Sequence, residues 1–281
     1  MAQRSTNTVG QTDSAGRSIL MATVVTVMAV MPVFLFGAFV VLIRDDIPVA
    51  DSELGLIVAA FFLASSSSSI PGGRFADRLG ATAGMTMGSV TSLASLLGIG
   101  LLSSQWWHLA GFMILGGIGS GIGMSASNLL LARNVPRDKR GFAFGIKLAA
   151  APVAGSVAGL SVPLVGLTSG WRWALVGLPV ARWVGFLVLR PPAAATAADS
   201  RAASRARAPV LPMILLASAS GFAAASATVT IGFFEESAVE RGFSTGAAGY
   251  ALAIGSFAGI FARVLWGWLA DRRGRGHLAF L

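Results

Sequence analysis

The residues best placed to do chemistry are three cations that lie inside long apolar stretches. They are Lys147, Arg182 and Arg263, and no Asp or Glu lies well inside any such stretch. A charge at the centre of a membrane helix costs about 2.5–3.5 kcal/mol on insertion scales, so it needs a partner or an exit to water. Backbone carbonyls, water, further helices or an anionic substrate could supply that partner. This all-cationic interior favours an anionic substrate.

Each of these residues also has an interpretation that involves no ligand. Lys147 and Arg263 lie a few residues from the ends of their apolar stretches, where a long side chain can extend to the membrane surface. Arg182 lies near the middle of its stretch, where an error in the predicted register or a protein-facing position is the alternative. Asn128 is a further polar candidate in another stretch. We predict Lys147, Arg263, Asn128 and Arg182 as substrate-binding residues.

The sequence contains no pattern typical of an enzyme. It has no cysteine, so a thiol nucleophile and a Cys-ligated metal are excluded. The two histidines, His108 and His277, are not in a metal-ligand spacing, and no G-x-x-x-x-G-K-[ST] phosphate-binding loop occurs. We therefore predict no catalytic residue, no metal and no cofactor, and a protein that is not an enzyme.

The elements that carry these residues are predicted to be membrane helices. Hydrophobic residues make up 54% of the 281 positions, charged residues 12%, and the mean hydropathy is +0.74; a soluble domain has roughly 25% charged residues. About 18 or more apolar residues in a helix cross a hydrocarbon core of roughly 30 Å. We predict an all-α integral membrane protein with about eight spans: Ile19–Ile43, Leu54–Ile70, Thr82–Leu102, Leu109–Ala132, Phe142–Leu167, Trp173–Leu189, Val210–Phe234 and Gly246–Leu269.

The basic residues are distributed unequally between alternate loops. Fifteen lie in one set: Arg4, Arg17, Arg74, Arg78, Arg133, Arg137, Lys139, Arg140, Arg190, Arg201, Arg205, Arg207, Arg272, Arg273 and Arg275. The other set has only Arg44, Arg172 and Arg241, together with most of the acidic residues. Because cytoplasmic loops carry the excess of Lys and Arg, both termini are predicted to be cytoplasmic. The net charge of +9 thus reflects orientation in a lipid bilayer rather than nucleic-acid binding.

The chain is predicted to divide into three parts. A basic stretch rich in Pro, Ala and Ser, at 190–209, is typical of a flexible linker. It separates a six-helix bundle at 1–189 from a partial second bundle at 210–281. The preference for Arg over Lys, with abundant Ala and Gly, is typical of a GC-rich bacterial gene, so we expect the protein to lie in a bacterial inner membrane.

An octapeptide motif, G-x-[FL]-A-D-R-x-G, occurs after the second and after the eighth predicted span. Its defined positions are Gly73, Asp77, Arg78 and Gly80 in the first copy and Gly267, Asp271, Arg272 and Gly274 in the second. Gly73 and Gly80 would allow the chain to reverse between helices. Asp77 would lie near a helix N-terminus, where negative charge is favoured, and Arg78 suits the anionic inner leaflet. The repeat indicates two related helical units.

This repeated loop resembles the signature loop of the major facilitator superfamily. The resemblance implies twelve helices in two six-helix bundles, of which about eight are present, and a cytoplasmic latch formed by the motif carboxylates Asp77 and Asp271. It also implies that Lys147 and Arg263 lie near each other across a cavity. Because the chain ends at Leu281, we expect a truncated form, a fragment or a frame error.

A narrower resemblance concerns one branch of that family. Stretches at 140–147, 170–173 and 233–238, together with Ala151-Pro152 and Arg263, are similar to the cyanate-porter-like branch. Pro152 would allow a kink in the fifth span, and Gly155 and Gly159 would allow close helix packing.

The function indicated is secondary transport of a small solute by alternating access, with an anion favoured as substrate. The alternatives are efflux of drugs or other hydrophobic compounds, and a non-transporting membrane fragment.

Overall fold

The structure is a computed structural model that describes residues 2–177 and 233–273, with four isolated positions between them (180, 211, 215 and 218). Side chains at 2–14, 137, 235 and 270–273 lie outside this description. Within the described part the chain is helical and forms no strand, and six of its helices are long and apolar enough to cross a membrane. The predicted all-α membrane class is confirmed to this extent.

The helices follow the apolar blocks of the sequence. Their bounds are α1 Ala2–Ala38, α2 Val40–Asp46, α3 Asp51–Leu79, α4 Ala81–Leu102, α5 Trp106–Asn134, α6 Arg140–Leu148, α7 Ala150–Ser161, α8 Leu167–Ser169, α11 Phe234–Glu240 and α12 Thr245–Arg273. A 3-10 turn at Arg137–Lys139 precedes α6, and a π-helical segment at Val162–Gly166 joins α7 to α8. Six of the eight predicted spans coincide with these helices. The spans Trp173–Leu189 and Val210–Phe234 and the linker 190–209 lie largely or wholly outside the described residues.

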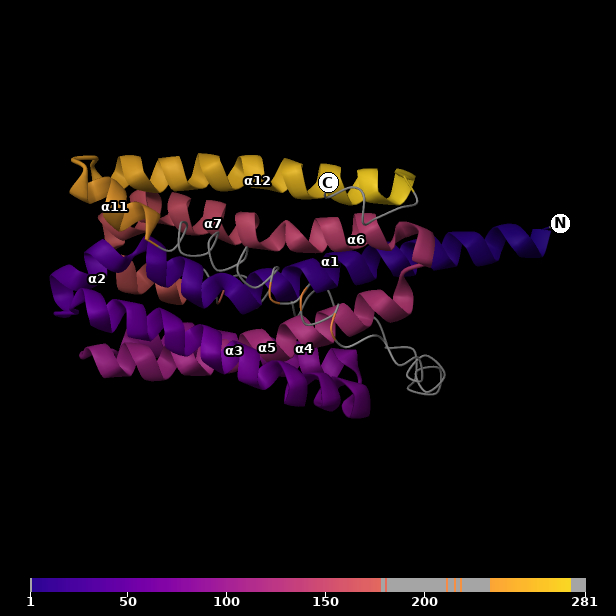
Figure 1. Ribbon diagram of the computed structural model, residues 1–281, viewed down its shortest axis with the longest axis horizontal. Helices are drawn as coiled ribbons and strands as arrows, with labels where there is room; N and C mark the ends of the chain where they lie inside the picture. The colour runs from indigo at the N-terminus through magenta and orange to yellow at the C-terminus, as the bar shows by residue number, and fades with distance from the viewer. Residues whose placement is uncertain are drawn as a thin grey trace.

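The arrangement places α1 between two groups of helices (Figure 1). On one side α12 packs on α6 and α7, and on the other lie α3, α4 and α5. Glycines of α5 allow its neighbours to approach closely: a Cβ at Gly117 would lie 2.2 Å from the Phe61 carbonyl oxygen, and one at Gly119 would lie 2.8 Å from the Gly88 carbonyl oxygen. At these glycines the backbones of neighbouring helices contact each other directly, without side chains between them, as is common in membrane helix bundles.

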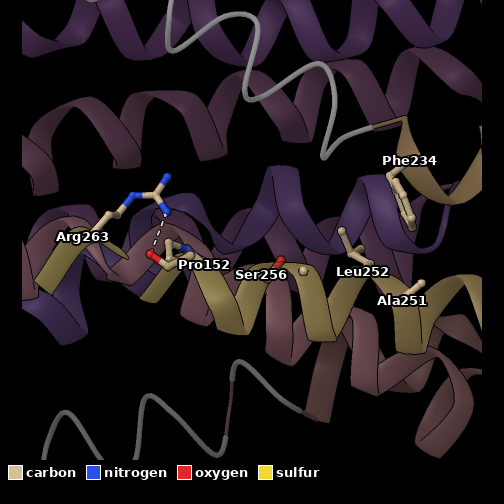
Figure 2. A pocket seen from close by; sticks show the side chains of 8 residues that line it. Pro152, Phe234, Ala251, Leu252, Ser256 and Arg263 are labelled. Carbon is tan, nitrogen blue, oxygen red and sulfur yellow. Dashed lines mark hydrogen bonds between the residues drawn. The ribbon is translucent and has the colours of Figure 1, made fainter. Parts of the chain in front are cut away.

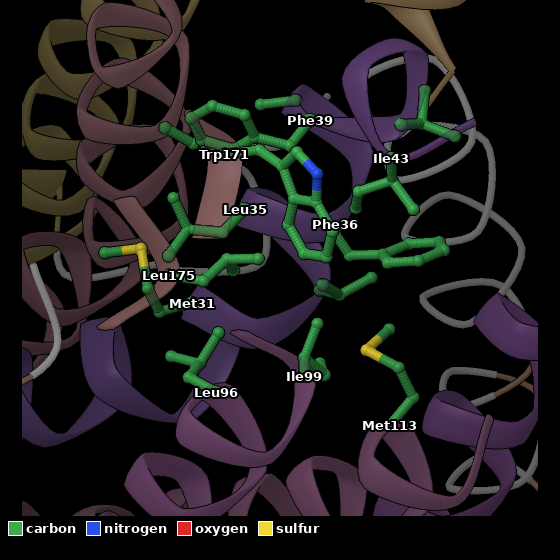
Figure 3. Close-up of a cluster of buried hydrophobic side chains, with 14 of the residues drawn as sticks. Met31, Leu35, Phe36, Phe39, Ile43, Leu96, Ile99, Met113, Trp171 and Leu175 are labelled. Carbon is green, nitrogen blue, oxygen red and sulfur yellow. The ribbon is translucent and has the colours of Figure 1, made fainter. Parts of the chain in front are cut away.

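A buried cluster of large apolar side chains fills the region where α1 and α2 meet the helical segment that begins near Trp171 (Figure 3). Phe36 and Phe39 are 1% and 0% exposed, and Trp171 is 4% exposed. Leu96 and Ile99 of α4 and Met113 of α5 also belong to this cluster. The cluster packs the first helices into one unit, against which α6, α7 and α12 lie.

The first copy of the repeated motif is largely helical, which corrects two predictions. Helix α3 continues to Leu79, so Gly73 does not reverse the chain; Gly80, with φ +94°, makes the turn alone. Asp77 accordingly lies in the last turn of α3 and not at a helix N-terminus. The helix continues because it packs on α5: a Cβ at Gly72 would lie 2.8 Å from Ile122 Cα. In the second copy Gly267, Asp271 and Arg272 lie within α12, and Gly274 is outside the described residues.

A proline lies at the break in the fifth span, whereas the first span continues through its proline and breaks later, at Phe39. Helix α1 continues through Pro32 and ends at Ala38. In contrast, α6 ends at Leu148 and α7 begins at Ala150, just before Pro152. Since a proline ring removes the backbone N–H that would bond four residues back, the break lies where Pro152 disrupts the helix.

Candidate functional site

Helices α7 and α12 contact each other closely through glycines. A Cβ at Gly159 would lie 2.6 Å from the Gly249 carbonyl oxygen. Toward its C-terminal end, α12 passes α6 in the same way: a Cβ at Gly145 of α6 would lie 3.1 Å from Gly267 Cα. These two contacts hold the backbones together and leave room for a pocket beside the stretch between them.

That pocket has a volume of about 210 Å³ and lies along one face of α12 (Figure 2). Its lining consists of Pro152 of α7, Phe234 of α11, and Ala251, Leu252, Gly255, Ser256, Gly259 and Arg263 of α12. Arg263 and Phe234 lie at opposite ends of this group, with Ser256 between them. The pocket is therefore mostly apolar, with a cation at one end.

The two polar groups of the pocket are poorly satisfied by the protein. Arg263 Nη1 donates to the Gly259 carbonyl at 3.3 Å, and no carboxylate in the described part of the chain forms an ion pair with it. Ser256 is 7% exposed, and its hydroxyl has no hydrogen-bond partner among the described residues. Buried polar groups are nearly always hydrogen-bonded, so the Ser256 hydroxyl, which lies against Gly155 of α7, requires an explanation.

Two of the predicted substrate-binding residues form a pair of their own. Lys147 is 2% exposed, and its Nζ donates a hydrogen bond to Asn128 Oδ1 on α5. Asn128 itself is exposed. Lys147 is not among the residues that line the Arg263 pocket, so the structure does not bring Lys147 and Arg263 together in that pocket. Arg182, the fourth candidate, lies outside the described residues.

At the end of the bundle that carries α2 and α11, Arg44 connects elements far apart in the sequence. Its guanidinium donates hydrogen bonds to Glu236 of α11 and to Asp51 at the start of α3, and its Nε donates to the Val49 carbonyl at 3.0 Å. The Arg44 and Glu236 side chains are 25% and 18% exposed. Burial raises the pKa of the Glu236 carboxyl above its ordinary value, although the Arg44 guanidinium acts in the opposite direction.

A second set of polar contacts lies at the same end of the bundle. Trp171 Nε1 donates to Asp46 Oδ2 at 2.8 Å, and the Arg172 guanidinium lies 4.4 Å from the centre of the Trp171 ring. Arg172 also donates to the carbonyls of Gly100 and Ser103, both at 3.2 Å. These contacts connect the end of α2 to the end of α4. The position of Arg44 is therefore fixed relative to both helices.

At the other end, the first motif forms an ion pair within the early helices. Arg133 of α5 donates to Asp77 Oδ1 at 3.3 Å, and the Asp77 side chain is 57% exposed. Asp271, the equivalent residue in the second motif, has its backbone in α12, but its side chain is outside the description.

A family model of the Major Facilitator Superfamily matches residues 22–281 of this chain. The chain belongs to that family. It is therefore a multi-span membrane transporter, of a family whose members are typically not enzymes. A comparison with curated proteins gave no match.

Two features of this facilitator chain were missed by reasoning from the sequence. Arg44 was counted only as a loop charge, and Glu236 as a loop charge within the stretch 233–238, although an arginine in an otherwise acidic set of loops indicates a possible ion pair. Nothing in the sequence distinguished Ser256, because the hydroxyl of a serine in an apolar stretch usually donates to a backbone carbonyl of its own helix.

Proposed function

We propose that this facilitator is a secondary transporter that binds a small anion and moves it by alternating access. The observation that supports this most strongly is the pocket beside α7 and α12. It combines Arg263, which lacks a carboxylate partner in the described part of the chain, with the unsatisfied Ser256 hydroxyl. An anion would give the Arg263 guanidinium the charged partner that it lacks among the described residues.

The pocket suits an anion with a small apolar body. A guanidinium can bind a carboxylate or a similar oxyanion through two parallel N–H donors. The Ser256 hydroxyl lies against Gly155 of α7 and could donate to the same ligand after rotation of its side chain toward the pocket. Leu252 and Phe234 would then contact the remainder of the molecule. The substrate class that fits is a short organic acid or a small inorganic anion.

Alternating access requires that contacts between the early and the late helices break and re-form at each end. Support for closure at the α2–α11 end comes from the hydrogen bonds between Arg44 and Glu236. At the other end we propose that Asp271 acts as a latch between the early and the late helices.

The same proposal includes the organisation and location of the chain. We propose the boundaries 1–189, 190–209 and 210–281, a location in a bacterial inner membrane, and membership of the cyanate-porter-like branch. Reporter fusions within 190–209 should read cytoplasmic, and fusions near Glu240 external.

The test is flux into liposomes that contain the purified chain. A panel of organic and inorganic anions should yield at least one that exchanges across the membrane. Arg263→Gln should abolish this exchange, whereas Arg241→Gln, an exposed arginine away from the pocket, should not. Gly255→Leu offers a sharper variant: a Cβ at Gly255 meets nothing within 4 Å, so the new side chain can fill the pocket without displacing a helix. Exchange retained by both Arg263→Gln and Gly255→Leu would refute the site.

The mostly apolar lining also favours a second candidate, efflux of hydrophobic compounds. In that case lipophilic cations or neutral compounds would be moved and anions would not. Arg263→Gln would then leave transport intact, while Gly255→Leu would still reduce it. The two variants together therefore separate the two substrate classes.

A further inference from the structure

Lys147 differs from the other charged residues in how deeply it is buried. Among the side chains that the structure describes, it is the only charged one in the buried class, at 2% exposed. Its Nζ donates to Asn128 Oδ1 on α5. The burial comes from residues of this chain alone, so the side chain ends inside the bundle and not at its surface.

This buried cation has no carboxylate partner among the described residues. Lysines are almost never fully buried unless they are paired, yet none of the described ion pairs includes Lys147. The charged side chains described on α6 and on the elements that pack against it are Arg17, Arg133, Asp138, Lys139, Arg140 and Arg263. The one carboxylate in this set, Asp138, is exposed. The side chain of Asp271 lies outside the description.

The partner that Lys147 does have suits a side chain that changes its charge. A carboxylate would favour the ammonium form strongly, because the pair would lose its attraction when the proton left. An asparagine amide is neutral, and its oxygen accepts a hydrogen bond from an ammonium or from an amine. Its NH₂ group can also donate to the lone pair of a neutral amine. Asn128 can therefore bind Lys147 with or without the proton.

The residue type also matters at this position. The chain has 21 basic residues, of which only Lys139 and Lys147 are lysines. A guanidinium does not release its proton in a protein, whereas a buried lysine can act as a proton acceptor and donor. No Asp, Glu or His lies well inside any predicted span. Within the spans of this sequence, Lys147 is thus the residue best suited to exchange a proton.

Helix α6 connects Lys147 to the helix that carries the anion pocket. A Cβ at Gly145, two residues before Lys147, would lie 3.0 Å from the Arg263 carbonyl oxygen. Helix α6 thus contacts α12 through Gly145 and α5 through Lys147. Charges separated by apolar protein interact more strongly than charges in water. An anion at Arg263 would therefore offset part of the cost of a positive charge on Lys147.

We propose that Lys147 binds and releases a proton that crosses the membrane together with the anion, an assignment that rests on the proposed anion transport. A hydronium ion would transfer its proton to the neutral amine and leave water, and the ammonium would return the proton to water on the other side. The loaded protein changes state with Lys147 charged, because the anion offsets that charge. The empty protein returns with Lys147 neutral. One proton and one monovalent anion thus move together without net charge.

The experiment measures anion and proton movement into liposomes that contain the full chain and a trapped pH-sensitive dye. The probe is the monovalent anion that exchanges fastest in a panel that includes lactate and nitrate. For the wild type, an imposed proton gradient should drive uptake of this anion, with one proton entering for each anion. A membrane potential of either sign should leave the uptake rate unchanged, because the movement carries no net charge.

Two variants of Lys147 should have different effects. Lys147→Arg keeps the charge but cannot release it, so exchange of anion for anion should persist while net uptake falls about 60- to 300-fold. That range is the cost of about 2.5–3.5 kcal/mol for a charge at the centre of a membrane helix, converted at about 1.4 kcal/mol per tenfold change. Lys147→Gln should keep net uptake but move no proton, so its rate should respond to the membrane potential. Lys139→Gln, at the exposed lysine, is the matched control and should behave as the wild type does.

Three results would overturn the assignment. The first is anion uptake by the wild type without protons, and the second is proton-coupled uptake by Lys147→Arg at the wild-type rate. The third is loss of anion exchange in both Lys147 variants while each still unfolds cooperatively on heating, which would mean that Lys147 binds the anion itself. Absence of exchange by the wild type with every anion of the panel would instead contradict the proposed function.

Discussion

The two ends of the bundle hold the late helices against the early ones by different kinds of contact. At the α2–α11 end the connection is polar, because Arg44 donates to Glu236 across 192 positions of sequence. At the other end α6 and α12 meet through backbone: a Cβ at Gly267 would lie 2.7 Å from the Gly141 carbonyl oxygen. The charged pair described at that end, Asp77 with Arg133, joins α3 to α5 and does not reach α12.

The kind of contact determines which substitutions can open each end. A hydrogen-bonded ion pair separates when water replaces its partners, so its strength depends on charge and on salt. A contact between glycines depends on the size of the residues and hardly at all on charge. Among the contacts that the structure describes, charge substitutions should therefore act on the α2–α11 end and size substitutions on the α6–α12 end, where the proposed Asp271 latch would add a contact that depends on charge.

The largest effect is expected where a side chain is added between α6 and α12. Gly267→Leu places atoms where the backbone of Gly141 and Gly145 lies, and neither backbone can yield without moving α6. Overpacking of this kind costs about 1–3 kcal/mol or more, so the thermal midpoint of the purified chain should fall sharply. Gly111→Leu is the control, because a Cβ at Gly111 meets nothing within 4 Å. If both variants unfold at the same temperature, the contact between α6 and α12 is not tight.

A smaller effect is expected from reversal of charge at the α2–α11 end. Glu236→Arg should open this end by about 1.5 kcal/mol, the lower range for a hydrogen bond to a charged group, which is roughly tenfold in equilibrium. The chain has no cysteine, so a single cysteine at Ser237, beside Glu236 in a pocket, reports accessibility to a thiol reagent without background. Labelling should become faster in Glu236→Arg and return toward the wild-type rate when Arg44→Glu is added.

Two controls sharpen that measurement. A cysteine at the exposed Ser104 should label at the same rate in all variants. Glu236→Gln keeps a hydrogen-bond acceptor for Arg44 but removes the charge, so its labelling rate should lie between those of the wild type and Glu236→Arg. If the double reversal labels as fast as Glu236→Arg alone, Arg44 and Glu236 do not act as a pair.

The smallest effect is expected from Asp77→Asn. Its ion pair with Arg133 is long, and the Asp77 carboxylate is largely exposed; pairs with an exposed partner contribute about 1 kcal/mol or less. The thermal midpoint should therefore shift only slightly, and labelling at Ser237→Cys should not change. A large loss of stability would show that Asp77 makes a contact beyond Arg133.

The helices could be predicted from the sequence, whereas the pairing of their polar groups could not. Apolar length is a local property, so the span at Thr82–Leu102 was found almost to the residue in α4. The extension of α3 through Gly73 depends on packing against Ile122 of another helix. The hydrogen bond between Lys147 and Asn128 depends on the rotation of two helices about their axes, which hydropathy does not determine.

The candidate site, like the fold, could be predicted from the sequence only in part. Arg263 was found because a cation in an apolar stretch is unusual. Its pocket was not, since the pocket exists only where Pro152 of α7 and Phe234 of α11 come beside α12. The lining residues are separated by many positions, and no spacing in the sequence connects them.

The most direct test of the central claim is ligand-induced stabilisation of the purified chain by a panel of anions at constant ionic strength. An anion that binds the folded state at 100 times its Kd stabilises it by about 2.7 kcal/mol, so at least one anion should raise the thermal midpoint. Arg263→Gln and Gly255→Leu should each remove that shift, and Lys147→Ala, outside the pocket, should keep it. No shift with any anion, together with a shift caused by lipophilic cations, would contradict an anion site at Arg263.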